Sequence, residues 1–135
     1  INDRLDRRSN IVPHIGSVSE LTNNSVDFAL TALNFHDVYN RSSDEAHERF
    51  TEVFNVLKPG GIFGVIDHEG TSGADNATLH RIAFDDAVKS ITSMGFALTG
   101  VSDLLENPSD DHTLGPFDPS LERNTDRFVL RFIKP

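Results

Sequence analysis

The chain has 135 residues, enough for one domain and too few for two. Twelve Lys and Arg against 21 Asp and Glu give a net charge of −9, which argues against nucleic acid or an anionic membrane as the main partner. The absence of cysteine excludes disulfides, thiolate metal sites and a cysteine nucleophile. No apolar run approaches the roughly 20 residues of a membrane span. The compartment stays open: we favour the cytoplasm, and a cysteine-free chain is also compatible with export.

Two apolar runs near the amino terminus predict strands. Residues 10–16 predict a short, weak strand, which Pro13 confines to a sheet edge or a strand end because proline has no N–H to donate. Residues 26–33 are almost continuously apolar, a pattern typical of a strand buried on both faces.

A helix follows, then a second buried strand. Ser42 and Glu45 form a predicted capping box, and the apolar stripe behind it recurs at helical spacing. Lys-Pro-Gly-Gly at 58–61 ends that helix, and residues 62–66 form the strand. The sequence therefore alternates strand, helix and strand.

The remaining chain predicts a helix at 84–94 and strands at 96–102 and 127–134. The long polar loop 103–126 between the last two strands is expected to be functional or mobile. Because no helix separates these two strands, the last one is expected to return antiparallel. The predicted fold class is α/β, with a mostly parallel Rossmann-like sheet and an antiparallel carboxyl-terminal strand.

These elements, with Leu-Lys-Pro-Gly-Gly at 57–61, resemble the second half of class I S-adenosylmethionine-dependent methyltransferases. A closer similarity, from about residue 10 to residue 135, is to a family of predicted bacterial methyltransferases. It rests on Asp67-His68, residues 78–82, Gly95-Phe96, residues 102–108, residues 110–113, residues 117–119 and residues 125–128. The resemblance implies that residues 1–135 form a single domain, the carboxyl-terminal portion of that fold, and that the cofactor is S-adenosylmethionine.

The sequence also departs from that family. Class I methyltransferases hold the cofactor with a Gly-rich turn after the first strand and an acidic residue ending the second, and neither is present here. Where many relatives place Gly-Asp for the adenine amino group, this chain has Gly16-Ser17. The resemblance assigns Gly16, Ser17, Asn34 and Phe35 to the cofactor. Because the site is only partial, cofactor binding is expected to be weak or absent, and the isolated chain inactive.

The resemblance places the motif Asn34-Phe35-His36-Asp37 opposite the methyl donor and acceptor, at the carboxyl end of a strand where open parallel sheets bind ligands. Asn34 is a candidate for hydrogen bonding the acceptor, and His36 for acting as general base. The alternative is that Asn34 and Asp37 only make loop hydrogen bonds while His36 is half-buried.

Asp67-His68-Glu69 ends the neighbouring strand on the same rim. Two acids around one imidazole would raise its pKa and orient it, so Asp67 and His68 are catalytic candidates. Three consecutive extended residues cannot all face one ion, and we therefore predict no metal site here.

Arg81 precedes the second helix and is a candidate for clamping an anionic substrate. The alternative is an ion pair with Asp85, one helical turn later. In the long loop, residues 110–112 (Asp-Asp-His) suit a mobile lid that brings polar groups over the rim; the alternative is a solvated acidic loop.

Three functions remain open. The first is the carboxyl-terminal part of a methyltransferase acting on a small-molecule acceptor. The second is a non-catalytic module that dimerises or pairs with a missing amino-terminal half. The third, a dinucleotide-binding oxidoreductase, is disfavoured because GxGxxG is absent. In the class I strand order the run 26–33 would lose its neighbour, so we predict a homodimer or a complex with the missing half.

Overall fold

The computed structural model describes residues 8–135. Its helices are α2 (Phe35–Arg41), α3 (Ser43–Val56) and α4 (Phe84–Ser93), and its short 3-10 turns are η1 (Val18–Glu20) and η2 (Pro119–Leu121). Its strands are β1 (Val26–Ala32), β2 (Leu57–Gly70), β3 (Ile82–Ala83), β4 (Ala97–Ser102) and β5 (Arg127–Ile133). No helix among these residues is both long and apolar enough to cross a membrane.

The main sheet has the order β1-β2-β5-β4. Strands β1 and β2 run parallel, whereas β5 is antiparallel to both β2 and β4. The short β3 extends the sheet by pairing in parallel with Glu69 and Gly70 at the end of β2. The predicted α/β fold with an antiparallel final strand is confirmed.

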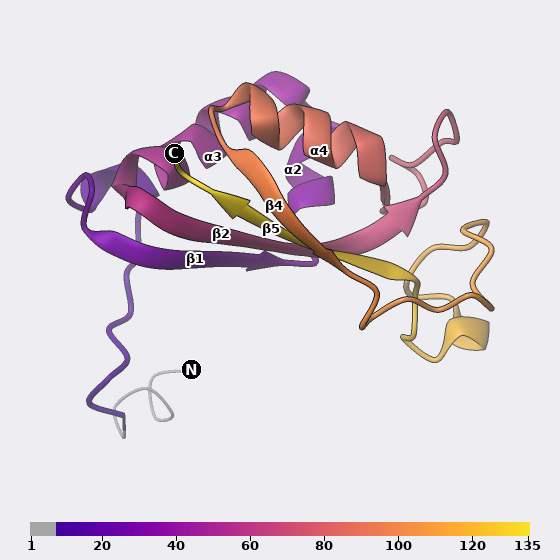
Figure 1. The fold of residues 1–135 in the computed structure, drawn as a ribbon. Coiled ribbons are helices and arrows are strands. Elements are labelled where there is room, and N and C mark those ends of the chain that lie inside the picture. Colours follow the sequence, from indigo (N-terminus) through magenta and orange to yellow (C-terminus); the bar gives the residue numbers. More distant parts are fainter. Residues whose placement is uncertain (1–7) are drawn as a thin grey trace.

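All three helices lie on one face of the sheet (Figure 1). The core between them is aromatic: the rings of Phe35, Phe50, Phe63, Phe96 and Phe132 are in successive contact. These side chains come from α2, α3, β2, the residue before β4, and β5, so burying them fixes the helices against the sheet. The first helical residues of α2 are thereby held beside the carboxyl end of β1.

The opposite face of the sheet is open in the described part of the chain. Phe28 and Leu30 of β1 are more than half exposed there, and both side chains lie over Gly64 of β2. The prediction that residues 26–33 form a strand buried on both faces is therefore wrong. Strand β1 is an edge strand, and no helix of residues 8–135 covers its outer face.

The predicted strand at residues 10–16 is also wrong. Residues 11–15 are irregular and exposed, and no strand of the described chain pairs with them. The physical reason is the absence of a neighbour: a strand forms only where another strand satisfies its N–H and C=O groups, and Pro13 supplies no N–H.

The first predicted helix begins where the sequence pattern places it. Ser42 is the N-cap of α3, with its hydroxyl accepting from the backbone N–H of Glu45 at 3.2 Å. The preceding helix α2 was not predicted from the sequence. Its seven residues form a short amphipathic helix, in which the side chains of Phe35 and Val38 are buried.

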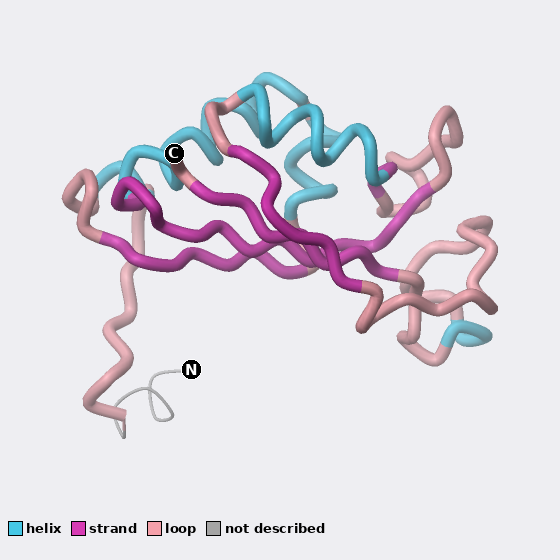
Figure 2. The backbone as a smooth tube through the Cα atoms, viewed as in Figure 1, coloured by secondary structure: helices cyan, strands magenta, loops and turns pink. Residues whose placement is uncertain are grey.

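Figure 2 shows the two long loops, residues 71–81 and 103–126, gathered at the end of the sheet where β2 ends. The second is tied to the first through Asp110, which is 5% exposed. The alternative of a solvated acidic loop is therefore wrong for Asp110, while the lid role of residues 110–112 stays a prediction.

Candidate functional site

The carboxyl ends of β1 and β2 bring two predicted residues together. The imidazole Nδ1 of His36, in the first turn of α2, donates to Asp67 Oδ1 of β2 at 2.6 Å. Asp67 is fully buried, and its carboxylate also accepts the backbone N–H of His36 at 2.7 Å and of His68 at 2.9 Å. One buried carboxylate thus fixes both the imidazole and the start of α2.

The two neighbouring imidazoles have opposite pKa shifts. Burial lowers the pKa of His36, but the hydrogen bond and charge of Asp67, together with Asp37, outweigh it and raise that pKa above its ordinary value. Burial lowers the pKa of His68 to about 4, against the opposing charge of Asp67, so the predicted rise in the pKa of His68 is wrong. His68 is therefore neutral at pH 7, and its Nδ1 lies 2.6 Å from the Thr125 hydroxyl.

A third histidine completes the cluster. His80 Nδ1 lies 3.1 Å from Asp37 Oδ1, and His36 Nε2 lies 3.1 Å from the same oxygen. A cavity of about 240 Å³ opens beside these groups. Its lining is Leu33, His36, Asp37, His68, His80, Pro116, Phe117, Arg123 and Arg127. The cavity thus lies between the carboxyl ends of β1 and β2 and the two long loops.

Arg81 does not face this cavity. Its guanidinium is fully buried and makes a salt bridge to Asp110 at 2.9 Å, with further hydrogen bonds to the carbonyls of Glu69 and Leu114. The predicted alternative, an ion pair between Arg81 and Asp85, is wrong, because the partner of Arg81 is Asp110 in the long loop. A buried guanidinium with these partners holds that loop against the end of β2, and its burial keeps it away from a substrate anion in the cavity.

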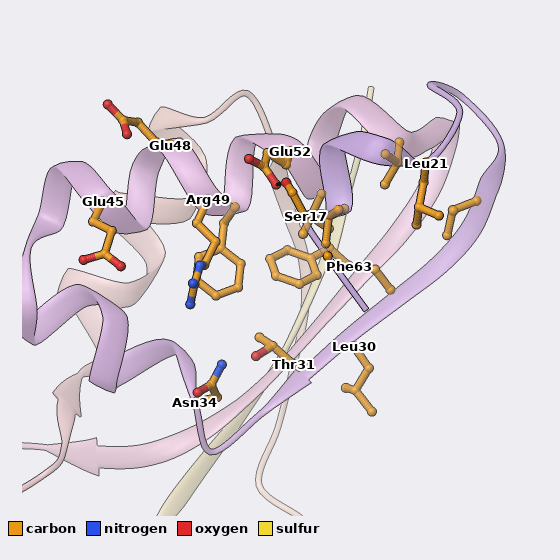
Figure 3. Close-up of a pocket in the computed structure, with 17 residues that line it drawn as sticks. Ser17, Leu21, Leu30, Thr31, Asn34, Glu45, Glu48, Arg49, Glu52 and Phe63 are labelled. Atoms are coloured by element: carbon orange, nitrogen blue, oxygen red, sulfur yellow. Dashed lines mark hydrogen bonds between the residues drawn. The ribbon is translucent and has the colours of Figure 1, made fainter. Parts of the chain in front are cut away.

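A larger cavity, of about 870 Å³, lies between α3 and the inner face of β1 (Figure 3). Gly16, Ser17 and Asn34, three of the four residues assigned to the cofactor, line it together. Its remaining lining is Val18, Leu21, Val26, Ala29, Leu30, Thr31, Glu45, Glu48, Arg49, Phe50, Glu52, Val53, Val56 and Phe63. Residues distant in sequence thus meet at one hollow along the edge strand.

The Gly16-Ser17 turn has a backbone conformation that favours glycine. Gly16 has φ +147°, where an L side chain is strained, whereas a Cβ there would meet only the flexible carboxylate end of Glu20. Ser17 caps η1, accepting from the Ser19 N–H, and its hydroxyl donates to Glu52 Oε2 of α3 at 2.6 Å. The turn is therefore anchored to the far wall of the cavity.

Phe35 lies elsewhere. Its ring is fully buried in the core, 4.7 Å from the ring of Phe50 between centroids, and it lines neither cavity. The assignment of Phe35 to the cofactor has no support in this geometry. Its burial instead holds α2, and with it Asn34 and His36, against the sheet.

Asp37 and His80 have no site role of their own in the sequence pattern. Asp37 enters it only as part of the motif 34–37, and His80 only within the matched residues 78–82. Their meeting depends on the loop 71–81 folding back over α2, where Asn40 Nδ2 donates to the carbonyl of Arg81 at 2.9 Å. No spacing in the sequence signals that contact.

No protein-family model matches the sequence, and no curated protein matches it. Solved structures do. A SAM-dependent methyltransferase from Aquifex aeolicus matches with a TM-score of 0.67 at 14% identity, over 98% of this chain and 61% of its own. The cyclase SpnF matches with a TM-score of 0.63 at 19% identity, over 90% of this chain and 55% of its own.

A third neighbour is the Haloferax volcanii complex of the Trm112 methyltransferase activator with a candidate methyltransferase: TM-score 0.60, 15% identity, 89% of this chain and 59% of that one. The chain thus spans between 55% and 61% of the length of these three neighbours. At such identities the likeness shows the fold, and SpnF shows that the fold also serves a cyclase. Residues 8–135 have the α/β fold of class I S-adenosylmethionine-dependent methyltransferases, while the closer similarity to one bacterial family stays a prediction.

Proposed function

We propose that this chain is the carboxyl-terminal part of a S-adenosylmethionine-dependent methyltransferase that acts on a small-molecule acceptor. The observation that carries the proposal is the cavity along β1, where Gly16, Ser17 and Asn34 meet. The sequence resemblance assigns these same three residues to the cofactor. The order β1-β2-β5-β4 supports it, since it corresponds to the fourth, fifth, seventh and sixth strands of the class I fold.

The residues of this cavity fit one part of the cofactor. Glu45, Glu48 and Glu52 outnumber the single cation Arg49 in its lining, which suits a ligand bearing a sulfonium and an ammonium group. The Gly-rich turn and the ribose-binding acid are not in the sequence. We therefore propose a partial cofactor site of weak affinity.

When bound, the cofactor supplies an activated methyl group, because its sulfonium is already a good leaving group. The residues of this chain then have to position the acceptor. Asn34 lies at the edge of the cofactor cavity, and His36, fixed by Asp67, faces the smaller cavity at the strand ends. We propose that Asn34 hydrogen-bonds the acceptor, and that His36 Nε2 takes the proton from an acceptor that loses one.

A second candidate function rests on the open face of β1. A non-catalytic module that pairs with a second copy, or with an amino-terminal half of the fold, would cover Phe28 and Leu30. The Trm112 complex gives a precedent for a partner-dependent protein of this fold. Both functions share the surface, but only the enzyme requires the cavity to bind the cofactor.

Amide chemical shifts distinguish the two functions. S-adenosylmethionine titrated into the ¹⁵N-labelled chain is expected to move the Gly16, Ser17 and Asn34 signals, and Asn34→Ala should weaken the effect. Asn55→Ala, an exposed change on α3 outside the cavity, is the matched control. Shifts confined to other residues, or none at millimolar ligand, would favour the non-catalytic module.

A further inference from the structure

Three side chains at the strand ends have the composition of a metal site. His36 Nε2, an Asp37 carboxylate oxygen and a His80 ring nitrogen all lie within 4.8 Å of one another. We propose that His36, Asp37 and His80 bind a divalent transition-metal ion of the Zn²⁺ type. The proposal concerns metal binding, and it gives His36 Nε2 a ligand role in place of the proton-acceptor role proposed above.

The hydrogen bond to Asp67 determines which nitrogen is available. Because His36 Nδ1 donates to the buried carboxylate, a neutral His36 carries its lone pair on Nε2. Nε2 lies 3.1 Å from Asp37 Oδ1, and when it is also protonated it donates to that carboxylate. A metal ion would take the place of that proton, and imidazole with carboxylate is a ligand set that zinc accepts.

Asp67 also provides the carboxylate that usually supports a metal-bound histidine. Metal-bound histidines usually donate their second ring N–H to a carboxylate, which fixes the ring orientation and strengthens the bond to the metal. The pair His36–Asp67 has that arrangement, and with 0% exposure for Asp67 no water competes for its oxygens. A general surface cluster of acids and histidines would lack such a buried support.

The third ligand is held from the other side of the site. His80 has φ +50°, a backbone conformation that non-glycine residues adopt only when the surroundings impose it. Asn40 of α2 holds the Arg81 carbonyl at 2.9 Å, and the buried Arg81–Asp110 ion pair anchors the next side chain. His80 is thereby fixed beside the same helix that carries Asp37.

The distances suit a metal after small side-chain movements. Zinc bonds of about 2.0–2.2 Å to nitrogen and oxygen place tetrahedral ligand atoms about 3.4 Å apart. Asp37 Oδ1 is 3.1 Å from each of the two histidine nitrogens, and the side chains of Asp37 and His80 are about half exposed and free to adjust.

Three protein ligands leave one position open, as in catalytic zinc sites. That position lies beside the cavity of about 240 Å³, whose lining includes the cations Arg123 and Arg127. An ion here would hold a water molecule or an anionic oxygen ligand against these guanidinium groups. His36 Nε2 would then be a ligand and not a free base.

Cobalt provides the most direct test, since Co²⁺ bound by nitrogen and oxygen ligands in a four- or five-coordinate site absorbs visibly. Titrating Co²⁺ into the full chain is expected to give a saturable 1:1 spectrum that Zn²⁺ displaces. Asp37→Asn and His80→Ala should each weaken binding by more than tenfold. Asp67→Asn should weaken it roughly 10- to 100-fold, as for other carboxylates behind a metal-bound histidine.

His47→Ala is the matched control, because His47 is an exposed histidine of α3 that contacts Ser93 and not this cluster. Circular dichroism confirms that each variant is folded, and Asp37 and His80 are exposed enough for the two decisive variants to fold. The absence of a saturable spectrum in the wild-type chain, or affinities unchanged in both Asp37→Asn and His80→Ala, would overturn the proposal. A loss in His47→Ala equal to that in His80→Ala would do the same.

Discussion

His36 Nδ1 and Asp67 Oδ1 lie 2.6 Å apart, joining the first turn of α2 to the carboxyl end of β2. Both side chains are almost completely buried, and the same carboxylate accepts two backbone N–H groups. A buried anion with three donors is stabilising only while all of them remain in place. The pair therefore holds the start of α2 against the carboxyl end of β2.

Asp67→Asn tests that role. The amide turns an NH₂ toward one of the three donors and removes the charge that they stabilise, so we expect a loss of about 3 kcal/mol in the free energy of unfolding. Urea denaturation measures it. Asp27→Asn is the control, because Asp27 is exposed and its ion-pair partner within residues 8–135 is Lys58; its cost should stay below about 1 kcal/mol. Equal costs for the two variants would show that Asp67 is not a buried anchor.

Asp110 makes the stability of the fold depend on pH in the acid range. Burial raises its pKa, but backbone donors of Asp126 and His112 and the Arg81 guanidinium outweigh that effect and hold the pKa below the ordinary value. The ionised carboxylate is thus the form that the folded state favours. Its contribution to stability is complete above the ordinary aspartate pKa and is lost as the pH falls through the lowered one.

We therefore expect Asp110→Asn to reduce stability at pH 7 and to flatten the stability profile in acid. Urea unfolding between pH 7 and pH 2 measures both effects. Asp103→Asn, an exposed change in the same loop, serves as control. If the free energy of unfolding of Asp110→Asn fell with pH as steeply as that of the wild type, Asp110 would not be the group responsible for the acid dependence.

Arg81→Lys examines the same ion pair from its other side. Lysine keeps the charge but cannot reach Asp110 and the carbonyls of Glu69 and Leu114 together, because it lacks the planar fork of donors. We expect a loss of about 3 kcal/mol and faster amide exchange across residues 103–126. Unchanged exchange in that loop would mean that Arg81 does not hold it.

The main elements could be predicted from the sequence because they depend on local patterns. The Ser42 cap and the stripe of α3 follow from spacings within a few residues, and the antiparallel final strand follows from the lack of a helical pattern in residues 103–126. The burial of residues 26–33 could not, since it depends on what covers the second face. An apolar run shows which side chains favour burial, but it does not show whether anything covers them. Here Phe28 and Leu30 lie on a face that no helix of residues 8–135 covers.

The site was predictable to the same extent. Asn34, His36, Asp67 and His68 could be placed at the rim because parallel strands end at one edge of a sheet. The partners of Arg81 and His80 could not, because Asp110 and Asp37 lie 29 and 43 positions away in the sequence and meet them only through loop packing. Long-range ion pairs of this kind leave no periodic signal.

The open face predicts association. Phe28 and Leu30 present an apolar edge, and we expect sedimentation velocity at micromolar concentration to show a homodimer of this chain. Phe28→Lys should give a monomer, because it places a charge on that face. Leu104→Lys is the matched control, since Leu104 is 81% exposed in the loop after β4. A wild-type monomer with an ordered amino terminus would show that the chain does not need a partner at this edge.

The central claim is that this chain holds one part of a S-adenosylmethionine site. Calorimetric titration of S-adenosylmethionine into the 135-residue chain measures it directly. Without the Gly-rich turn and the ribose-binding acid, several hydrogen bonds to the ligand are lost, and we expect a Kd near the millimolar range, about −4 kcal/mol. A micromolar Kd, about −8 kcal/mol, would show that these residues already form a complete cofactor site and would contradict the account.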